Sequence, residues 1–145
     1  MTEFESKNPE PKLSQDYRDT LRNAQGIARL YRSEAVGTEH LLLATIRHSS
    51  VERVLKDLGT SYRRVHINTD LIIGCGNKII EGEIVLTPRS RKVVELSKDE
   101  CIKSNSPQVT PEHLLAGLVR EGEGLAAGIL EAEGITIAKI RDYLK

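Results

Sequence analysis

The sequence contains no tryptophan, one phenylalanine and four tyrosines, so aromatic residues make up only 3% of its 145 residues. The core must therefore be filled mainly by Leu, Ile, Val and Ala, which pack well between closely spaced helices. A hydrophobic content of 39% is enough to bury such a core in a chain of single-domain length. The composition favours an all-α fold.

Cysteine is also scarce, because Cys75 and Cys101 are the only two, and no Cys/His cluster with metal-ligand spacing accompanies them. We expect a reducing cytoplasm and no metal site.

The 21 basic residues balance the 21 acidic ones, so the net charge does not attract the protein to nucleic acid or to an anionic membrane. No apolar run approaches the ~20 residues that cross a bilayer, and the polar N-terminus does not resemble a signal peptide. We therefore expect a soluble protein with protein partners.

Catalytic motifs are missing as well. The segment 74–78 is rich in glycine and ends in a lysine, but it lacks the G-x-x-x-x-G-K-[ST] spacing of a phosphate-binding loop. His40 and His113 each follow a glutamate without H-E-x-x-H spacing, so we interpret them as packed or capping histidines. We expect no enzymatic activity and no cofactor in this chain. A small hydrolase or metal enzyme is the least supported alternative.

Apolar periodicity and cap residues predict four helices in the first half of the chain. Residues 1–12 are polar and contain two prolines, which predicts a disordered arm. From Leu13 the apolar residues recur at spacings of three and four, which predicts a helix that Ser14 caps. Thr38, Ser50 and Ser61 are the predicted caps of three further helices, the last of which runs toward residue 74.

Residues 74–86 contain three glycines and a short β-prone pair, so we interpret them as a connector that could hold a hairpin. Thr87 and Pro88 provide a cap and a first helical position, and they predict a helix through Lys103. We therefore divide the chain into a first repeat over residues 13–73, the connector over 74–86, and a second repeat over 87–145.

The two halves are copies of one unit. The segment Val-Gly-Thr-Glu-His-Leu-Leu at residues 36–42 aligns with Val-Thr-Pro-Glu-His-Leu-Leu at residues 109–115, an offset of 73 residues. Leu13 and Leu86 keep that offset, whereas Gly59 aligns with Gly134 at an offset of 75. The two added residues fall in a predicted turn at 120–124, where insertions cost little. The duplication predicts two four-helix repeats, about eight helices in all, related by a pseudo-twofold axis.

These paired segments, together with residues 86–97 and 118–127, resemble the double Clp-N repeat at the N-terminus of Clp/Hsp100 unfoldases, most closely the ClpC type. The resemblance covers residues 13–145. It implies an appendage that binds adaptor proteins and substrates for an ATP-driven ring and its partner peptidase. It also implies that the isolated domain is monomeric, and that ATP binds only to modules outside this chain.

ClpC-type domains recognise phosphoarginine, with one site in each repeat, and this resemblance implies candidate ligand residues here. Glu39 and Glu112 match the glutamate that faces the guanidinium group. Thr38 and Ser14 are the matching candidates beside Glu39, and Thr110 and Thr87 are those beside Glu112. A carboxylate accepts two parallel hydrogen bonds from a guanidinium, and a helix start favours a phosphate. A glutamate in a first helical turn also has a plain capping role, which stays open.

The first repeat departs from the family pattern, because Ser14-Gln15-Asp16 stands where a Thr-Glu-Arg-like segment is usual. Asp16 would repel a phosphate, so we expect the site around Glu112 to be the stronger one. The alternative to an unfoldase domain is a free-standing accessory protein that docks on a Clp complex or regulates it.

Overall fold

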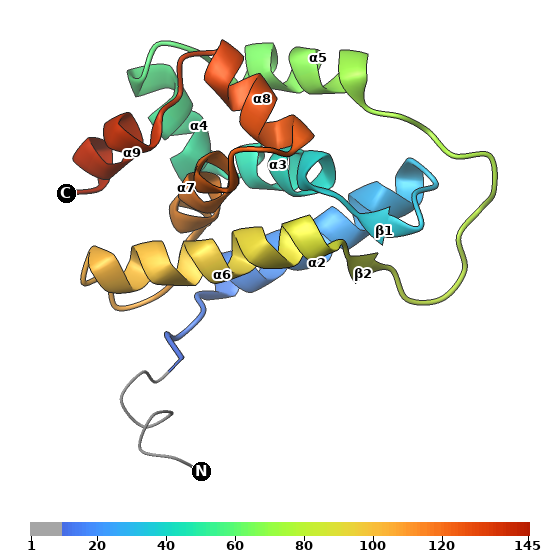
Figure 1. The fold of residues 1–145 in the computed structure, drawn as a ribbon, viewed down its shortest axis with the longest axis horizontal. Coiled ribbons are helices and arrows are strands. Elements are labelled where there is room, and N and C mark those ends of the chain that lie inside the picture. Colours follow the sequence, from blue (N-terminus) through green and yellow to red (C-terminus); the bar gives the residue numbers. More distant parts are fainter. Residues whose placement is uncertain (1–9) are drawn as a thin grey trace.

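The computed structural model describes residues 10–145, and this part of the chain forms eight helices and two short strands (Figure 1). The predicted all-α class with about eight helices is confirmed. None of these helices is long and apolar enough to span a bilayer. The elements are α2 (Gln15–Leu30), β1 (Ala35–Val36), α3 (Thr38–Ile46), α4 (Ser49–Asp57), α5 (Tyr62–Ile72), β2 (Val85–Leu86), α6 (Pro88–Lys103), α7 (Pro111–Glu121), α8 (Leu125–Ala132) and α9 (Ile137–Leu144).

Residues 1–9 of the predicted N-terminal arm lie outside the described residues. Lys12, the last residue of the predicted arm, contacts the second repeat. Its carbonyl oxygen accepts a hydrogen bond of 2.8 Å from the backbone N–H of Val109. Glu10 also lies 3.4 Å from the ammonium group of Lys98.

Most of the predicted helix caps are confirmed. Ser14, Ser61 and Thr87 each accept a hydrogen bond from the backbone N–H three residues on, at 3.0–3.1 Å. Two predicted caps were displaced. Helix α3 begins at Thr38, but Gly37 is its N-cap, and α4 begins at Ser49 with His48 as its N-cap.

The short extended segments of one repeat pair with those of the other. Strand β1 pairs in parallel with β2, so that Val36 lies opposite Leu86, and a parallel bridge joins Leu13 to Val109. Leu13 is equivalent to Leu86 and Val36 to Val109 at the offset of 73, so the same contact occurs twice with the repeats exchanged. This reciprocity is the mark of the predicted pseudo-twofold arrangement. The hairpin suggested for the connector is absent from the described residues, because its β-prone pair joins β1 instead.

The connector is attached to α2 through its carbonyl groups. Arg29 donates hydrogen bonds to the carbonyl oxygens of Ile80 and Gly82 at 2.6 and 2.7 Å. Gln25 donates another to the carbonyl of Ile84, whose side chain is only 1% exposed. Figure 1 shows the connector as a long loop beyond α5 that returns to β2. These contacts fix where the second repeat begins relative to the first.

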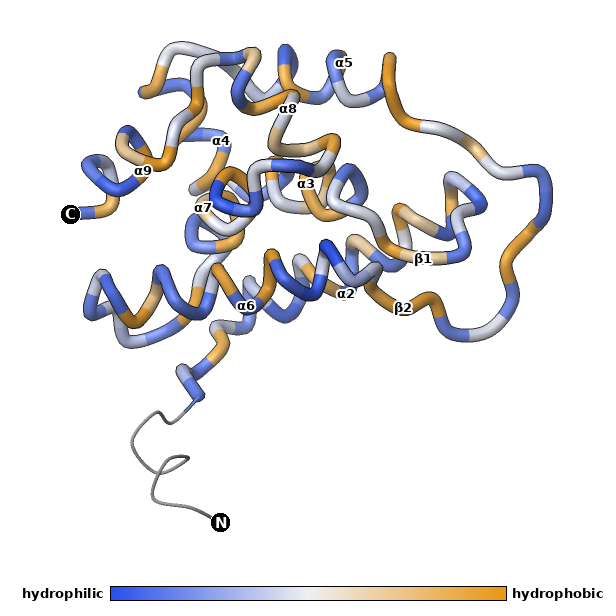
Figure 2. The backbone as a smooth tube through the Cα atoms, in the orientation of Figure 1, coloured by the Kyte–Doolittle hydropathy of each residue, from blue (hydrophilic) through white to orange (hydrophobic). Residues whose placement is uncertain are grey.

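Helices α3 and α7 form the centre of the molecule, and eight of the 9 residues of α3 and eight of the 11 residues of α7 are buried. Figure 2 shows that the outer helices α2 and α6 alternate between apolar and polar positions. Helices α6 and α7 approach closely at Gly117. A Cβ atom there would lie 2.6 Å from the carbonyl oxygen of Val93, so only glycine fits without a shift of the backbone.

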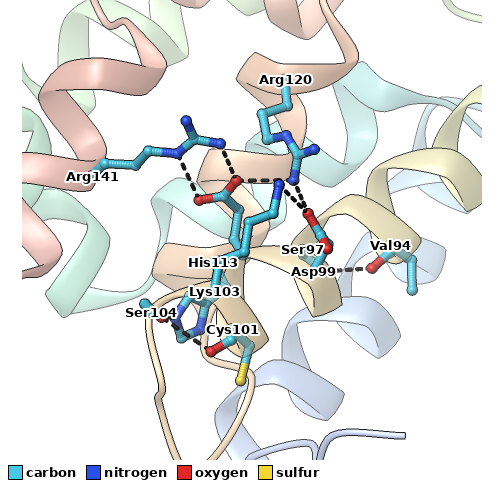
Figure 3. A network of polar contacts seen from close by, with 10 residues as sticks. Val94, Ser97, Asp99, Cys101, Lys103, Ser104, His113, Arg120 and Arg141 are labelled. Atoms are coloured by element: carbon cyan, nitrogen blue, oxygen red, sulfur yellow. Dashed lines mark hydrogen bonds and ion pairs between the residues drawn. The ribbon is translucent and has the colours of Figure 1, made fainter. Parts of the chain in front are cut away.

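An ionic network joins α6, α7 and the C-terminal helix α9 (Figure 3). Glu100 is 4% exposed, and its carboxylate binds Arg120 at 2.9 Å and Arg141 at 2.8 and 3.1 Å. Asp99 extends the network to Arg120 and Lys103, at 2.7 and 3.1 Å. The hydrogen bonds from Arg141 hold the pKa of Glu100 below its usual value, although burial opposes them. The network therefore positions α9 against α6 and α7 within the second repeat.

Candidate functional site

A cleft of about 640 Å³ lies between the two repeats, at the starts of α3 and α6. Thr38 and Glu39 line it from the first turn of α3, and Thr87 and Arg89 line it from the first turn of α6. Gly124, the N-cap of α8, closes a third side. We name this hollow the Glu39 cleft. The β1–β2 pair holds the two helix starts together, since β1 leads into α3 and β2 into α6.

Three helix N-termini therefore meet at the Glu39 cleft, those of α3, α6 and α8. The dipoles of the three helices make this end of the cleft favourable for negative charge. Gly124 permits the close approach of α8, because a Cβ atom there would lie 2.6 Å from Thr38 Oγ1. Thr38 Oγ1 also accepts a hydrogen bond of 3.4 Å from the backbone N–H of Ala126.

The charges of the cleft are mixed. Arg89 and Lys92 line it, and Arg89 Nε lies 3.1 Å from the carboxylate of Glu121. The other oxygen of Glu121 accepts the backbone N–H groups of Gly124 and Glu123 at 2.7 and 3.2 Å. Glu121 thus orients Arg89 and also holds the turn before α8. A ligand with both a positive and a negative group would find partners of each sign here.

His40 adds a buried donor to the wall of this cleft. Its Nδ1 accepts a hydrogen bond of 2.9 Å from the backbone N–H of Gly37, so a neutral ring carries its proton on Nε2. The side chain is 2% exposed, and within residues 10–145 no group accepts a hydrogen bond from Nε2. Burial lowers the pKa of His40. The equivalent His113 is satisfied, because its Nε2 lies 3.3 Å from Ser104 Oγ.

At the pseudo-equivalent site, at the starts of α2 and α7, the side chains contact one another. Asp16 stands where Arg89 stands in the other cleft, and its carboxylate lies 3.0 Å from His48 Nε2. His48 Nδ1 lies 2.7 Å from Ser50 Oγ, and Ser50 Oγ donates to Glu112 Oε1 at 2.8 Å. These four side chains form one relay, which we name the Glu112 relay. It already occupies the carboxylate that the sequence suggested for a guanidinium group.

The structure regroups the predicted site residues. Thr87 lies with Glu39 and Thr38 rather than with Glu112, and Ser14 caps the helix that carries Asp16, beside Glu112. The candidate residues are therefore grouped across the two repeats and not within each one, because the pairing of β1 with β2 joins the helix starts of different repeats. Thr110 serves as the N-cap of α7, and its backbone N–H donates to His113 Nδ1 at 2.9 Å. The capping role predicted for the two histidines is confirmed.

Sequence reasoning missed Glu121, which is 7% exposed and pairs with Arg89. Helix α7 has 11 residues and its counterpart α3 has 9, so α7 continues through two positions that are not helical after α3, and it ends at Glu121. The equivalent position in the first repeat is His48, the centre of the Glu112 relay.

The chain matches the family model described as the Clp repeat (R) N-terminal domain over residues 12–132, with a further match over residues 86–145. It belongs to this family. Chaperone protein ClpC2 of rice chloroplasts is 40% identical over 120 residues, which cover 81% of this chain and 13% of the relative. The Bacillus subtilis protein named negative regulator of genetic competence ClpC/MecB is 37% identical over 130 residues, which cover 83% of this chain and 16% of the relative.

Solved Clp N-domains share the fold. The N-terminal domain of Hsp104 from Candida albicans superposes with a TM-score of 0.76 at 15% identity, and the match covers 92% of this chain and 89% of that one. The chain thus corresponds to the N-terminal domain of Clp/Hsp100 unfoldases, and ClpC proteins are among its relatives. It spans less than a fifth of the length of the two ClpC relatives named above.

Proposed function

We propose that this domain docks adaptor and substrate proteins for a ClpC-type unfoldase, and that it recognises phosphoarginine on substrates in the Glu39 cleft. The observation that carries the proposal is the convergence of three helix N-termini on a cleft that also contains Arg89, Lys92 and Glu39. Phosphoarginine carries a phosphoryl group on a guanidinium group. The helix starts and basic side chains suit the former, and a carboxylate suits the latter.

The Glu112 relay favours a single site. Its carboxylate accepts a hydrogen bond from Ser50, and Asp16 adds negative charge beside it. We therefore propose one phosphoarginine per domain, in the Glu39 cleft.

Calorimetric titration with free phosphoarginine and with a phosphoarginine peptide tests this proposal. We expect a stoichiometry of one. Glu39→Gln should weaken binding by tenfold or more, because a charge-assisted hydrogen bond contributes about 1.5–3 kcal/mol. Glu112→Gln is the matched control at the equivalent position, and it should leave the affinity unchanged. If Glu112→Gln abolished binding and Glu39→Gln retained it, the ligand would lie in the site around Glu112, and our assignment would be wrong.

Delivery of bound proteins to an ATPase ring and a peptidase is part of the proposal, because this chain corresponds to only the N-terminal part of its relatives. Reading the gene beyond Lys145 tests that link. A downstream Walker motif supports an unfoldase, and a stop codon supports a separate accessory protein.

We also propose a cytoplasmic location. Cys75 and Cys101 are free thiols, as a reducing compartment would leave them.

A further inference from the structure

An apolar groove of about 470 Å³ lies between α5 and α8. Three of its large side chains are exposed to water: Leu71 is 80% exposed, Ile72 52% and Leu125 45%. Such a cluster differs from single apolar residues scattered over a surface, because contiguous apolar patches mark binding sites. Its apolar lining consists of Leu71, Ile72, Leu125, Gly128, Ile129 and Ala132, together with one face of Gly124. We name this hollow the α5–α8 groove.

Helix α8 presents a continuous face to the groove. Leu125, Gly128, Ile129 and Ala132 are spaced by three, one and three residues, which places them on one side of a helix. Gly128 deepens the groove, since a Cβ atom built there would meet no other atom within 4 Å. A glycine in the interior of a short helix costs stability. At Gly128 the missing side chain leaves open space and does not make room for a close contact that would offset the cost.

The groove continues the Glu39 cleft. Glu123, Gly124 and Leu125 line both hollows, so the apolar groove begins at the start of α8, where the charged cleft ends. One extended chain could therefore place a charged side chain in the cleft and its neighbours in the groove. Helix α8 has eight residues and is about 12 Å long. That length accommodates roughly three or four residues of extended chain.

We propose that the α5–α8 groove binds apolar side chains of the same polypeptide segment whose phosphoarginine occupies the Glu39 cleft. This inference rests on the proposed function and deepens it, because it makes the ligand an extended chain with leucine-like residues within about four positions of the marked arginine. Apolar residues are exposed in this way in unfolded chains, whereas a folded protein buries most of them.

A second copy of the domain fits the groove less well. A stable interface takes roughly 20–30 residues from each partner, and the groove offers three exposed apolar side chains and a floor about 12 Å long. A short extended segment needs no more than this. Asn68 and Glu123 also line the groove, as polar neighbours for the backbone of such a segment, although Asn68 Nδ2 already donates to Glu133 at 2.8 Å.

Three synthetic peptides test the inference by calorimetry. The first peptide carries phosphoarginine among serines and alanines. The second has the same phosphoarginine and, in addition, two leucines on either side of it, within four residues. The third has those leucines and an unmodified arginine in place of the phosphoarginine. We expect the leucines to tighten binding of the phosphorylated peptide about tenfold, as partial burial of such side chains would. Gly128→Leu should abolish this gain and leave the first peptide unaffected. Leu71→Ser should reduce the gain, and Leu30→Ser, at a residue 76% exposed on α2, is its matched control.

The outcomes separate this inference from the proposed function. Equal affinity for the first two peptides would overturn the groove and leave the phosphoarginine site standing. If the first peptide fails to bind while the third binds wild type and not Gly128→Leu, the groove stands and the phosphoarginine site falls. Dimerisation of the wild type that Leu71→Ser abolishes would assign the groove to a second copy and overturn the inference. Circular dichroism establishes that each variant is folded.

Discussion

The phenol oxygen of Tyr17 lies 2.6 Å from Ser97 Oγ, although 80 residues separate them in the chain. Tyr17 belongs to α2 and Ser97 to α6, so this hydrogen bond joins the first helices of the two repeats. Neither residue has any exposed surface. Burial raises the pKa of Tyr17 to about 12. The contact therefore lies in the interface between the two repeats. At each of the two sites this interface brings together a helix start from one repeat and a helix start from the other.

We expect Tyr17→Phe to lower the free energy of unfolding by about 1 kcal/mol, because it removes one buried hydrogen bond and leaves the ring in place. Ser97 keeps its hydrogen bond to the carbonyl oxygen of Val94, which limits the loss. Urea denaturation measures the change. Tyr62→Phe is the control, since the Tyr62 ring is only partly buried, and it should have little effect. Equal stability of wild type and Tyr17→Phe would show that the hydrogen bond contributes nothing to the interface.

Two glycines should respond in opposite ways to replacement by alanine. Gly117→Ala places a methyl group against the backbone of Val93, so we expect a loss of about 1–3 kcal/mol. Gly128→Ala enters open space within α8 and should gain up to about 1 kcal/mol from helix propensity. Thermal and chemical denaturation of both variants measure these effects. A Gly117→Ala variant as stable as Gly128→Ala would mean that α6 and α7 can move apart freely.

The two capping histidines make stability depend on pH. Burial holds the pKa of His40 and of His113 below the ordinary value of 6.5, so protonation is easier in the unfolded chain. Their contribution is therefore complete above pH 6.5 and is lost as the pH falls through the lower pKa of the folded state. Protonation of Nδ1 would also break the hydrogen bond from the N-cap backbone.

Denaturation curves between pH 8 and pH 5 test this expectation. Glutamine can accept the same N-cap hydrogen bond and does not titrate. His40→Gln/His113→Gln should therefore lose less stability on acidification than wild type does. The expectation is wrong if the double variant and wild type have parallel pH profiles.

Arg89 should decide which of the two equivalent sites binds an anion. Arg89→Asp gives the Glu39 cleft the charge that Asp16 brings to the other site, and it removes the partner of Glu121. We expect phosphoarginine affinity to fall by tenfold or more, because a favourable charge becomes a repulsive one. Arg91→Asp makes the same charge change two residues on, outside the lining of the cleft, and should have a much smaller effect. Equal losses in both variants would indicate a response to net charge alone.

The sequence was sufficient for the fold because each repeat carries the same local signals. Ser14 and Thr87 both cap helices, and Gly59 and Gly134 both adopt a positive φ at helix ends, at 96° and 78°. The grouping of the site residues was harder to predict. It depends on β1 and β2, which are two residues long, and such short strands carry no pattern that specifies their partner.

The contacts among the side chains of the Glu112 relay also could not be predicted from the sequence. Histidine is not a preferred N-cap, so His48 gave no sign that it begins α4 or that it joins Asp16 to Ser50. Glu121 ends α7, but it lies in residues 120–124, which were predicted to form a turn. Both residues act through side-chain contacts with another helix of their own repeat, His48 with Asp16 and Glu121 with Arg89. Local periodicity does not report contacts of that kind.

The exchanged pairing of Leu13 with Val109 and of Val36 with Leu86 has an evolutionary consequence. A single copy of the repeat could complete these contacts only with a second copy, as the two subunits of a symmetric homodimer do. Identical subunits would carry two identical clefts, and every substitution would alter both. Once the two copies share one chain, Arg89 can stand in one cleft while Asp16 stands in the other. Covalent linkage is thus what allows one cleft to stay open to a ligand while its twin becomes part of the scaffold.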